Sequence, residues 1–317
     1  MKNNKLVIIA PCYNEEEIIE YSVEQLLLVL NIMIDDGLVS QNSKICFVND
    51  GSSDKTKEII ENHCKNNKIA LIDLSKNCGQ QCAILAGLNS VDADMYVTID
   101  ADLQDDPMLI IEMVKKYFEG YDIVYGCRKR RETDSFFKKN TALLFYKFMN
   151  IIGINIRQNH SEFRLLSKFT VEKLKEYKEK TIFLRGIVQN IGLKSCNIYY
   201  DGLERLAGKT KYSFLKLLEL AWSAITSFSL LPLRLITVVG LMTSFLSLLV
   251  IIYAVVSYVK HYSIPGWTSI IMTVAFFSGI IIMSLGIIGE YLSKVLIEVK
   301  NRPLYQISGT INLRDYE

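Results

Sequence analysis

A dense group of carboxylates follows the apolar segment at residues 95–99. Asp100, Asp102, Asp105 and Asp106 all lie within seven residues. Carboxylates this close repel each other unless a cation or protons neutralise them. A hard cation such as Mg²⁺ is commonly held by one or two carboxylates, and water and substrate phosphates supply its other ligands. The spacing therefore predicts that Asp100 and Asp102 bind Mg²⁺ or Mn²⁺ together with a diphosphate.

An acidic turn is the simpler interpretation of the same residues. Asp106 precedes Pro107, and this order is typical of a helix start, where the carboxylate caps the first free backbone amides. We assign residues 105–107 to such a turn. Because Asp-x-Asp alone is a weak motif, the metal interpretation of Asp100 and Asp102 depends on what lies beside them.

Two further polar segments also follow short apolar segments. Pro-Cys-Tyr-Asn-Glu at residues 11–15 comes after residues 5–10, and Asn-Asp-Gly-Ser-Ser-Asp at residues 49–54 comes after residues 45–48. Neither carries the glycines of a dinucleotide fingerprint, and the chain contains no P-loop motif. The sequence therefore argues against Rossmann oxidoreductases and P-loop nucleotidases and predicts a nucleotide pocket of another kind.

The elements that position these segments alternate between strand and helix. Asn14 and Glu17 resemble a capping box that starts a helix ending near residue 34. Five strands are predicted at residues 5–10, 45–48, 69–74, 95–99 and 123–125, with helices between them near residues 54–65, 80–89 and 107–119. Strict alternation predicts an α/β fold with a mostly parallel sheet flanked by helices on both faces. The polar segments would then share the carboxyl-end edge of the sheet, where open α/β sheets bind ligands.

The regular alternation of predicted strands and helices ends after residue 126. A basic run at residues 128–131 is interpreted as a solvated turn rather than a membrane contact, and a helix is predicted near residues 136–152. Glu162 and Arg164 form a charged pair within an otherwise apolar segment. A helix near residues 170–177, an edge strand at 196–200 and a basic loop at 205–212 are predicted to follow.

Two long uncharged segments lie near the C-terminus. Residues 235–259 and 267–289 are each long enough to cross a hydrocarbon core of about 30 Å. The short connection between them predicts an antiparallel hairpin, and the lysines and arginines flanking its outer ends predict cytoplasmic ends. The predicted divisions are a cytoplasmic catalytic domain at 1–212, an amphipathic interface helix at 213–232, the two transmembrane helices at 233–293 and a cytoplasmic tail at 294–317. We expect a multi-pass protein of the cytoplasmic membrane.

The overall composition excludes several classes of protein. The net charge is only +2, and no nucleic-acid-binding motif occurs, so a nucleic-acid partner is not predicted. The seven cysteines show no metal-ligand spacing and no Cys-x-x-Cys pair. This usage suits a reducing compartment, and the N-terminus lacks the apolar core of a signal peptide.

Together the three polar segments and the C-terminal hairpin resemble family 2 glycosyltransferases with the GT-A fold. The hairpin and the tail Gly-Glu-Tyr-Leu at 289–292 through Val-Lys-Asn-Arg-Pro at 299–303 look like the bacterial polyprenyl-phosphate branch, with dolichol-phosphate mannose synthases as more distant relatives. The resemblance implies that Asp100 and Asp102 bind the metal on the diphosphate of a nucleotide sugar. It implies nucleotide-sugar contacts for Pro11, Tyr13, Asn14, Glu15, Asn49, Asp50, Asp100 and Gln104. Relatives commonly carry Asp at the position of Asn49.

The resemblance also implies the reaction. A polyprenyl phosphate such as undecaprenyl phosphate would attack the sugar directly and invert its anomeric centre. A phosphate monoester has a second pKa of about 6, so this nucleophile needs positioning more than deprotonation. Glu162 stands where relatives place a catalytic Asp, and we expect it to act as a positioning group or weak base; an ion pair with Arg164 at the surface is the alternative. Arg164, Arg205 and Lys211 are the candidates for binding the acceptor phosphate. Plain contacts with lipid headgroups are the alternative for Lys209 and Lys211.

The sequence does not name the sugar donor. UDP-glucose is the first hypothesis, followed by UDP-N-acetylglucosamine and GDP-mannose. A processive polysaccharide synthase is disfavoured because the chain lacks Gln-x-x-Arg-Trp and has only two predicted spans. A non-catalytic membrane adaptor that senses nucleotide sugars is the alternative from another class. The branch that the chain resembles also implies a homo-oligomer, commonly a tetramer.

Overall fold

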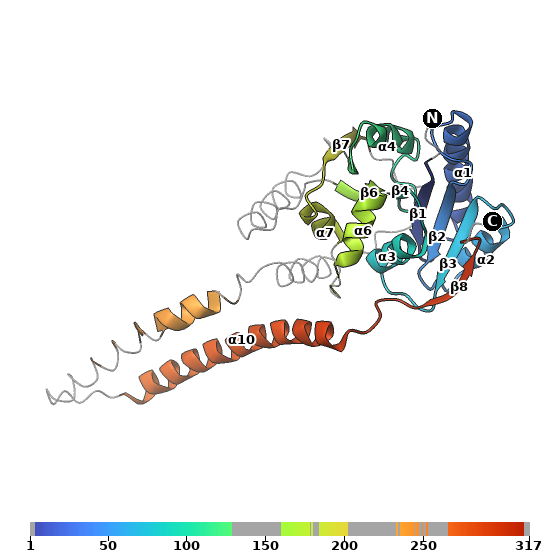
Figure 1. Ribbon diagram of the computed structural model, residues 1–317. Coiled ribbons are helices and arrows are strands. Elements are labelled where there is room, and N and C mark those ends of the chain that lie inside the picture. The colour runs from blue at the N-terminus through green and yellow to red at the C-terminus, as the bar shows by residue number, and fades with distance from the viewer. Residues whose placement is uncertain are drawn as a thin grey trace. The chain divides into compact units, whose positions relative to one another are not determined.

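A computed structural model describes residues 4–128, 160–177, 179, 184–201, 233, 235–243, 245–246, 249, 252 and 266–313. These residues fall into two compact units. One unit holds the described residues from 4 to 201 and from 302 to 313, and the other holds the described residues from 233 to 301. Figure 1 shows the elements of both units.

The first unit is built on one sheet of eight strands in the order β7-β5-β6-β4-β1-β2-β3-β8. The strands are β1 (Leu6–Cys12), β2 (Lys44–Asn49), β3 (Ile69–Leu74), β4 (Met95–Thr98), β5 (Ile123–Arg128), β6 (His160–Ser167), β7 (Ser195–Tyr200) and β8 (Ile307–Ile311). β1 pairs in parallel with β2 and β4, β2 with β3, and β5 with β7. β6 and β8 run antiparallel to their neighbours. The predicted mostly parallel α/β sheet is confirmed.

Helices cover both faces of this sheet (Figure 1). They are α1 (Ile19–Asp35), α2 (Thr56–His63), α3 (Gln80–Ser90), α4 (Leu109–Phe118), α6 (Lys168–Glu176) and α7 (Leu184–Asn190). On one face, apolar residues of α1 and α4 share a core with alternate residues of the strands, such as Ile8 and Phe47. On the other face, α3, α6 and α7 pack against the intervening residues, such as Ile9. The strands are therefore buried on both sides, as parallel strands usually are.

Two predicted helix starts are wrong. α1 begins at Ile19 without a side-chain cap, because Asn14 has a left-handed backbone (φ 53°) and its side chain bonds to Ser53 instead. α4 begins at Leu109, two residues beyond Pro107. Asp106 still accepts a hydrogen bond from the backbone amide of Met108 at 2.9 Å, so it closes the turn that precedes the helix.

The second unit contains α10 (Trp267–Lys300), a helix of 34 residues. Within the described residues, one helical segment, Phe276–Lys300, is long and apolar enough to cross a membrane, with a mean hydropathy of 1.9 and none of it buried. The predicted second span at 267–289 lies inside α10, which continues past the predicted end. Of the predicted first span, residues 235–243 are helical and most of the rest lies outside the described residues, as does the predicted interface helix at 213–232.

Candidate active site

The acidic segment follows β4 at the carboxyl-end edge of the sheet. Asp102 accepts two hydrogen bonds from Gln104, one from its backbone amide at 3.3 Å and one from its side-chain amide at 2.9 Å. A left-handed backbone at Leu103 (φ 46°) makes the tight turn that brings these two side chains together. Asp100 accepts a hydrogen bond from the side chain of Gln80, the first residue of α3. The segment is thus held by its own turn and by a helix start.

The surroundings of Asp100 disfavour its ionised form. Burial, reinforced by the charges of Asp102 and Asp105, raises the pKa of Asp100 to about 6, although Gln80 and Arg128 act in the opposite direction. A carboxylate in such surroundings is stabilised by a positive charge placed beside it. The arrangement therefore favours the binding of a cation at Asp100.

Asp105 has a role that the sequence did not indicate. Its side chain is 1% exposed, and one oxygen accepts hydrogen bonds from Arg128 Nε at 2.6 Å and from the Tyr200 hydroxyl. Its other oxygen makes no hydrogen bond to any described residue. Arg128 also donates to Gln104 at 3.2 Å. The assignment of Asp105 to a simple helix-capping turn is therefore wrong, because it pairs with a basic residue from β5. Arg128 in turn belongs to the sheet and the site rather than to a solvated turn.

The donor set suits a hard divalent cation. In the described part of the chain, no group of three or more His, Cys, Asp and Glu side chains is arranged to hold a metal ion. Two carboxylates are nevertheless sufficient where water and substrate phosphates supply the remaining ligands. The carboxylates of Asp100 and Asp102 are oxygen ligands of the required kind, whereas the amide oxygen of Gln104 accepts a hydrogen bond from Arg128. The residues therefore fit Mg²⁺ or Mn²⁺.

The first two polar segments are joined to each other by hydrogen bonds. Asn14 donates its backbone amide to Ser52 Oγ at 3.0 Å and accepts from the backbone amide of Ser53 at 2.8 Å. Glu15 donates its backbone amide to Thr56 Oγ1 at 2.8 Å. Residues 11–15 and 49–54 therefore form one surface at the ends of β1 and β2. Tyr13 is 39% exposed on this surface.

Asp50 connects this surface to the start of α3. Its two oxygens accept hydrogen bonds from the backbone amides of Cys78 at 2.7 Å and Gly79 at 2.9 Å. Burial raises the pKa of the Asp50 carboxyl group even though these two bonds lower it. Because Gln80 on the same helix start reaches Asp100, α3 links the 49–54 segment to the acidic segment. The three polar segments predicted from the sequence thus lie at the ends of β1, β2 and β4, which are adjacent strands.

Glu162 and Arg164 lie on β6, between β4 and β5. Their side chains form an ion pair and are only 3% and 2% exposed. The pair is therefore buried, and the alternative of an exposed pair is wrong. The β4–β6 register pairs Thr98, the last residue of β4, with Arg164, and the Thr98 hydroxyl donates to the backbone carbonyl of Glu162. Glu162 therefore lies next to the end of β4, the strand that the acidic segment follows. Arg205 and Lys211 lie outside the described residues.

Known proteins resemble the chain over most of its length. Residues 7–175 match the model described as Glycosyl transferase family 2. The chain is 45% identical over 305 residues to the uncharacterized glycosyltransferase YkoT of Bacillus subtilis, covering 95% of this chain and 90% of the relative. It is 34% identical to the SfII prophage-derived bactoprenol glucosyl transferase of Shigella flexneri, covering 96% and 97% of the two chains.

A solved structure is also similar at low identity. Glucosyl-3-phosphoglycerate synthase of Mycobacterium tuberculosis, in complex with Mn²⁺, UDP and phosphoglyceric acid, has a TM-score of 0.48 and 15% sequence identity. The similarity covers 70% of this chain and 76% of that chain.

Proposed function

The chain belongs to glycosyl transferase family 2, and from this premise we propose that it transfers glucose from UDP-glucose to a polyprenyl phosphate, with inversion at the anomeric carbon. Glycosyl transfer to a polyprenyl phosphate is supported by the bactoprenol glucosyl transferases that it resembles over 96% of its length. The observation that carries the proposal is the meeting of three polar segments at the ends of β1, β2 and β4. UDP-N-acetylglucosamine and GDP-mannose are the alternative donors.

The donor would lie across these three segments. We assign the nucleoside to the surface formed by Pro11, Tyr13, Asn14, Glu15, Asn49 and Asp50, and the diphosphate to the acidic segment. Asp100 and Asp102, with Gln104 beside them, would hold Mg²⁺ or Mn²⁺. Such an ion, when bound, stabilises the negative charge that develops on the departing diphosphate. Arg128, which pairs with the buried carboxylate of Asp105, keeps Gln104 oriented toward Asp102 through the bond at 3.2 Å.

The acceptor phosphate would attack from the side of β6. A phosphate oxygen forms a bond to the anomeric carbon as the bond from that carbon to the diphosphate oxygen breaks. The acceptor phosphate is already ionised near neutral pH. Glu162 therefore serves to position this nucleophile rather than to remove a proton from it. We assign the binding of the acceptor phosphate to Arg164 and to Arg205 and Lys211 of the basic loop.

We also propose that the chain crosses the cytoplasmic membrane twice, at residues 235–259 and 267–289, with both termini in the cytoplasm. The positive residues Arg234, Lys294, Lys300 and Arg302 at the outer ends support this orientation. A homo-tetramer is the assembly we propose in the membrane. Its mass can be measured by light scattering of the detergent-solubilised protein.

The experiment that tests the function is a donor screen with the full chain. Purified protein in detergent receives undecaprenyl phosphate, Mn²⁺ and each nucleotide sugar in turn, and the extracted lipid is analysed by mass spectrometry. We expect a lipid phosphate carrying one hexose from UDP-glucose, with a β linkage by NMR. Asp100→Asn and Asp102→Asn should lower the rate about 10²- to 10³-fold, the scale of losing a group that stabilises charge in the transition state.

Asp106→Asn is the matched control, because it lies in the same segment and an amide oxygen can still accept the bond from Met108. Its rate should remain near that of the wild type. A retained anomeric configuration would exclude the direct displacement. Donor binding without transfer from any nucleotide sugar would favour the membrane adaptor.

A further inference from the structure

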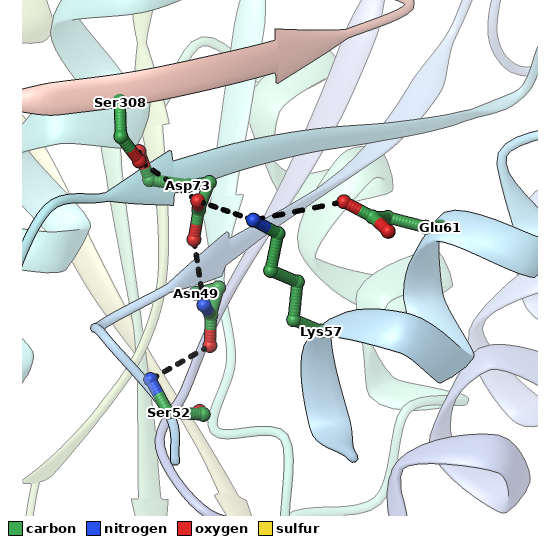
Figure 2. A network of polar contacts seen from close by, with 6 residues as sticks. All are labelled: Asn49, Ser52, Lys57, Glu61, Asp73 and Ser308. Atoms are coloured by element: carbon green, nitrogen blue, oxygen red, sulfur yellow. Dashed lines mark hydrogen bonds and ion pairs between the residues drawn. The ribbon is translucent and has the colours of Figure 1, made fainter. Parts of the chain in front are cut away.

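A network of polar side chains lies next to the 49–54 segment, at one edge of the sheet. The carboxylate of Asp73, on β3, accepts hydrogen bonds from three different elements (Figure 2). The donors are Asn49 Nδ2 on β2 at 2.7 Å, Lys57 Nζ on α2 at 2.9 Å and Ser308 Oγ on β8 at 2.7 Å. One carboxylate therefore joins a neighbouring strand, a helix and the C-terminal strand.

Asn49 connects this network, through its hydrogen bonds, to the proposed nucleotide-binding surface. Its side chain is buried, and its amide oxygen accepts a hydrogen bond from the backbone amide of Ser52 at 3.3 Å. Ser52 Oγ in turn accepts the backbone amide of Asn14 at 3.0 Å. The amide group of Asn49 thus faces Asp73 with its donor end and the 49–54 segment with its acceptor end.

The residue type at position 49 follows from this geometry. A carboxylate there would lie in direct contact with the carboxylate of Asp73, and two like charges at that distance repel strongly. An aliphatic residue would remove one hydrogen-bond donor to the Asp73 carboxylate and the acceptor for the backbone amide of Ser52. Only an amide of this size donates in one direction and accepts in the other.

The position of Ser308 depends on a β-bulge. Along β8, Gly309 pairs with Asp73 and Ile307 pairs with Leu74, so Ser308 is the extra residue between them. Bulges of this kind re-aim a side chain, and here the hydroxyl meets both the carboxylate and the backbone carbonyl of Asp73.

The C-terminal strand is anchored on both sides of Ser308. The backbone amide of Ser75 donates to the carbonyl of Gln306 at 2.9 Å. Beyond the strand, the side chain of Asn312 donates to the carbonyl of Ile69 at 3.0 Å, and Lys44 donates to the carbonyl of Asn312 at 3.0 Å. These hydrogen bonds therefore fix β8 to this edge of the sheet.

We propose that Ser308 and Asp73 are positioning residues for the nucleotide sugar: acting through Asn49, they fix the 49–54 segment, so that donor binding requires the C-terminal strand to be docked on β3. The inference rests on the proposed function for the identity of the donor. Its structural content, the dependence of the 49–54 segment on Ser308, is independent of the donor.

The test uses the full chain in detergent and compares Ser308→Ala with Thr310→Ala. Thr310 is exposed on the same strand, so its replacement controls for the loss of a β-branched or polar strand residue. Hydrogen–deuterium exchange of the peptide that covers residues 49–54 should accelerate about ten-fold in Ser308→Ala, the scale of one hydrogen bond to a charged group. Thr310→Ala should exchange like the wild type, and Ser308→Thr, which keeps the hydroxyl, should restore protection.

A second pair of variants tests the route through Asn49. Asn49→Asp should raise the KM for UDP-glucose about ten-fold or more, on the scale of a lost charged hydrogen bond, with little change in kcat. Asn49→Asp combined with Asp73→Asn exchanges the amide and the carboxylate, and it should restore much of the KM. A double variant that stays as impaired as Asn49→Asp would overturn the proposed route.

The hydrogen–deuterium exchange measurement tests the inference independently of whether the protein transfers a sugar. Equal exchange of the 49–54 peptide in Ser308→Ala and Thr310→Ala would overturn it. If the wild type transfers no sugar from UDP-glucose while Ser308→Ala still accelerates exchange, the proposed function fails and the positioning role is supported.

Discussion

Gly51 is the residue on which the geometry of the 49–54 segment most directly depends. Its backbone is left-handed (φ +66°), and a Cβ atom there would lie 2.6 Å from the backbone nitrogen of Asn77 and 2.6 Å from the carbonyl carbon of Lys76. The neighbouring residues Cys78 and Gly79 supply the amides that bind Asp50. Any side chain at position 51 must therefore push the two segments apart.

We expect Gly51→Ala to lower both the melting temperature and the affinity for UDP-glucose. Gly192→Ala is the matched control, because Gly192 is also left-handed (φ +73°) but its nearest atom, Asn190 O, would be 3.8 Å from the new Cβ. The control should show only the cost of a left-handed alanine, about 1–2 kcal/mol. Equal melting temperatures for the two variants would show that the close backbone contact is unimportant.

Asp73 gives the network a defined pH dependence. Burial alone would raise its pKa, but hydrogen bonds from Lys57, Asn49 and Ser308 outweigh burial and hold the pKa of Asp73 below its ordinary value. A carboxylate with a lowered pKa stabilises the fold above its unfolded-state pKa of about 3.9, and this stabilisation is lost as the pH falls through the folded-state pKa.

The difference in melting temperature between the wild type and Asp73→Asn should therefore be constant from pH 6 to pH 5. It should shrink as the pH falls below about 4. Thermal unfolding of the detergent-solubilised protein across this range measures it. Asp35→Asn, at an exposed position, controls for the removal of one negative charge. A difference that grows toward acidic pH would contradict the assignment of the network.

At the scale of the elements, periodicity and composition predicted the parallel part of the sheet and the helices between its strands. β1, β2, β3 and β4 are apolar runs of the expected length, and their burial on both faces explains why the signal is clear. The edge at which Asn14, Asp50 and Asp100 meet follows from that alternation alone. This part of the candidate site was therefore predictable from the sequence.

The sequence could not reveal the two antiparallel strands. β6 carries Glu162 and Arg164 at alternate positions, which is typical of a solvated face, yet the two charges satisfy each other inside the sheet. β8 is a short strand of exposed residues far along the chain from its partner β3. The pairing of Asp105 with Arg128 and Tyr200 was hidden for the same reason, because long-range contacts leave no local period. Such pairings depend on tertiary structure, which overrides local propensity.

At the scale of the whole molecule, the order of the two units along the chain restricts the membrane topology. Residues 160–201 precede the second unit in the sequence and residues 302–313 follow it, yet both belong to the same compact unit and the same sheet. One folded unit lies on one side of a bilayer. A chain that leaves this unit, enters the membrane and returns to it must therefore cross the bilayer an even number of times.

If Phe276–Lys300, the candidate span in the described residues, crosses the membrane, a second crossing is required, and we predict it at the uncharged run 235–259. Alkaline phosphatase, which is active only after export, reports the side on which it is fused. In a bacterial host, a fusion at Ser263, between the two runs, should be active, and fusions after Tyr200 and after Glu317 should both be inactive. An active fusion after Glu317 would mean an odd number of crossings. It would separate β8 from β3 by a membrane, so it would contradict the pairing of these strands within one chain as well as the predicted hairpin.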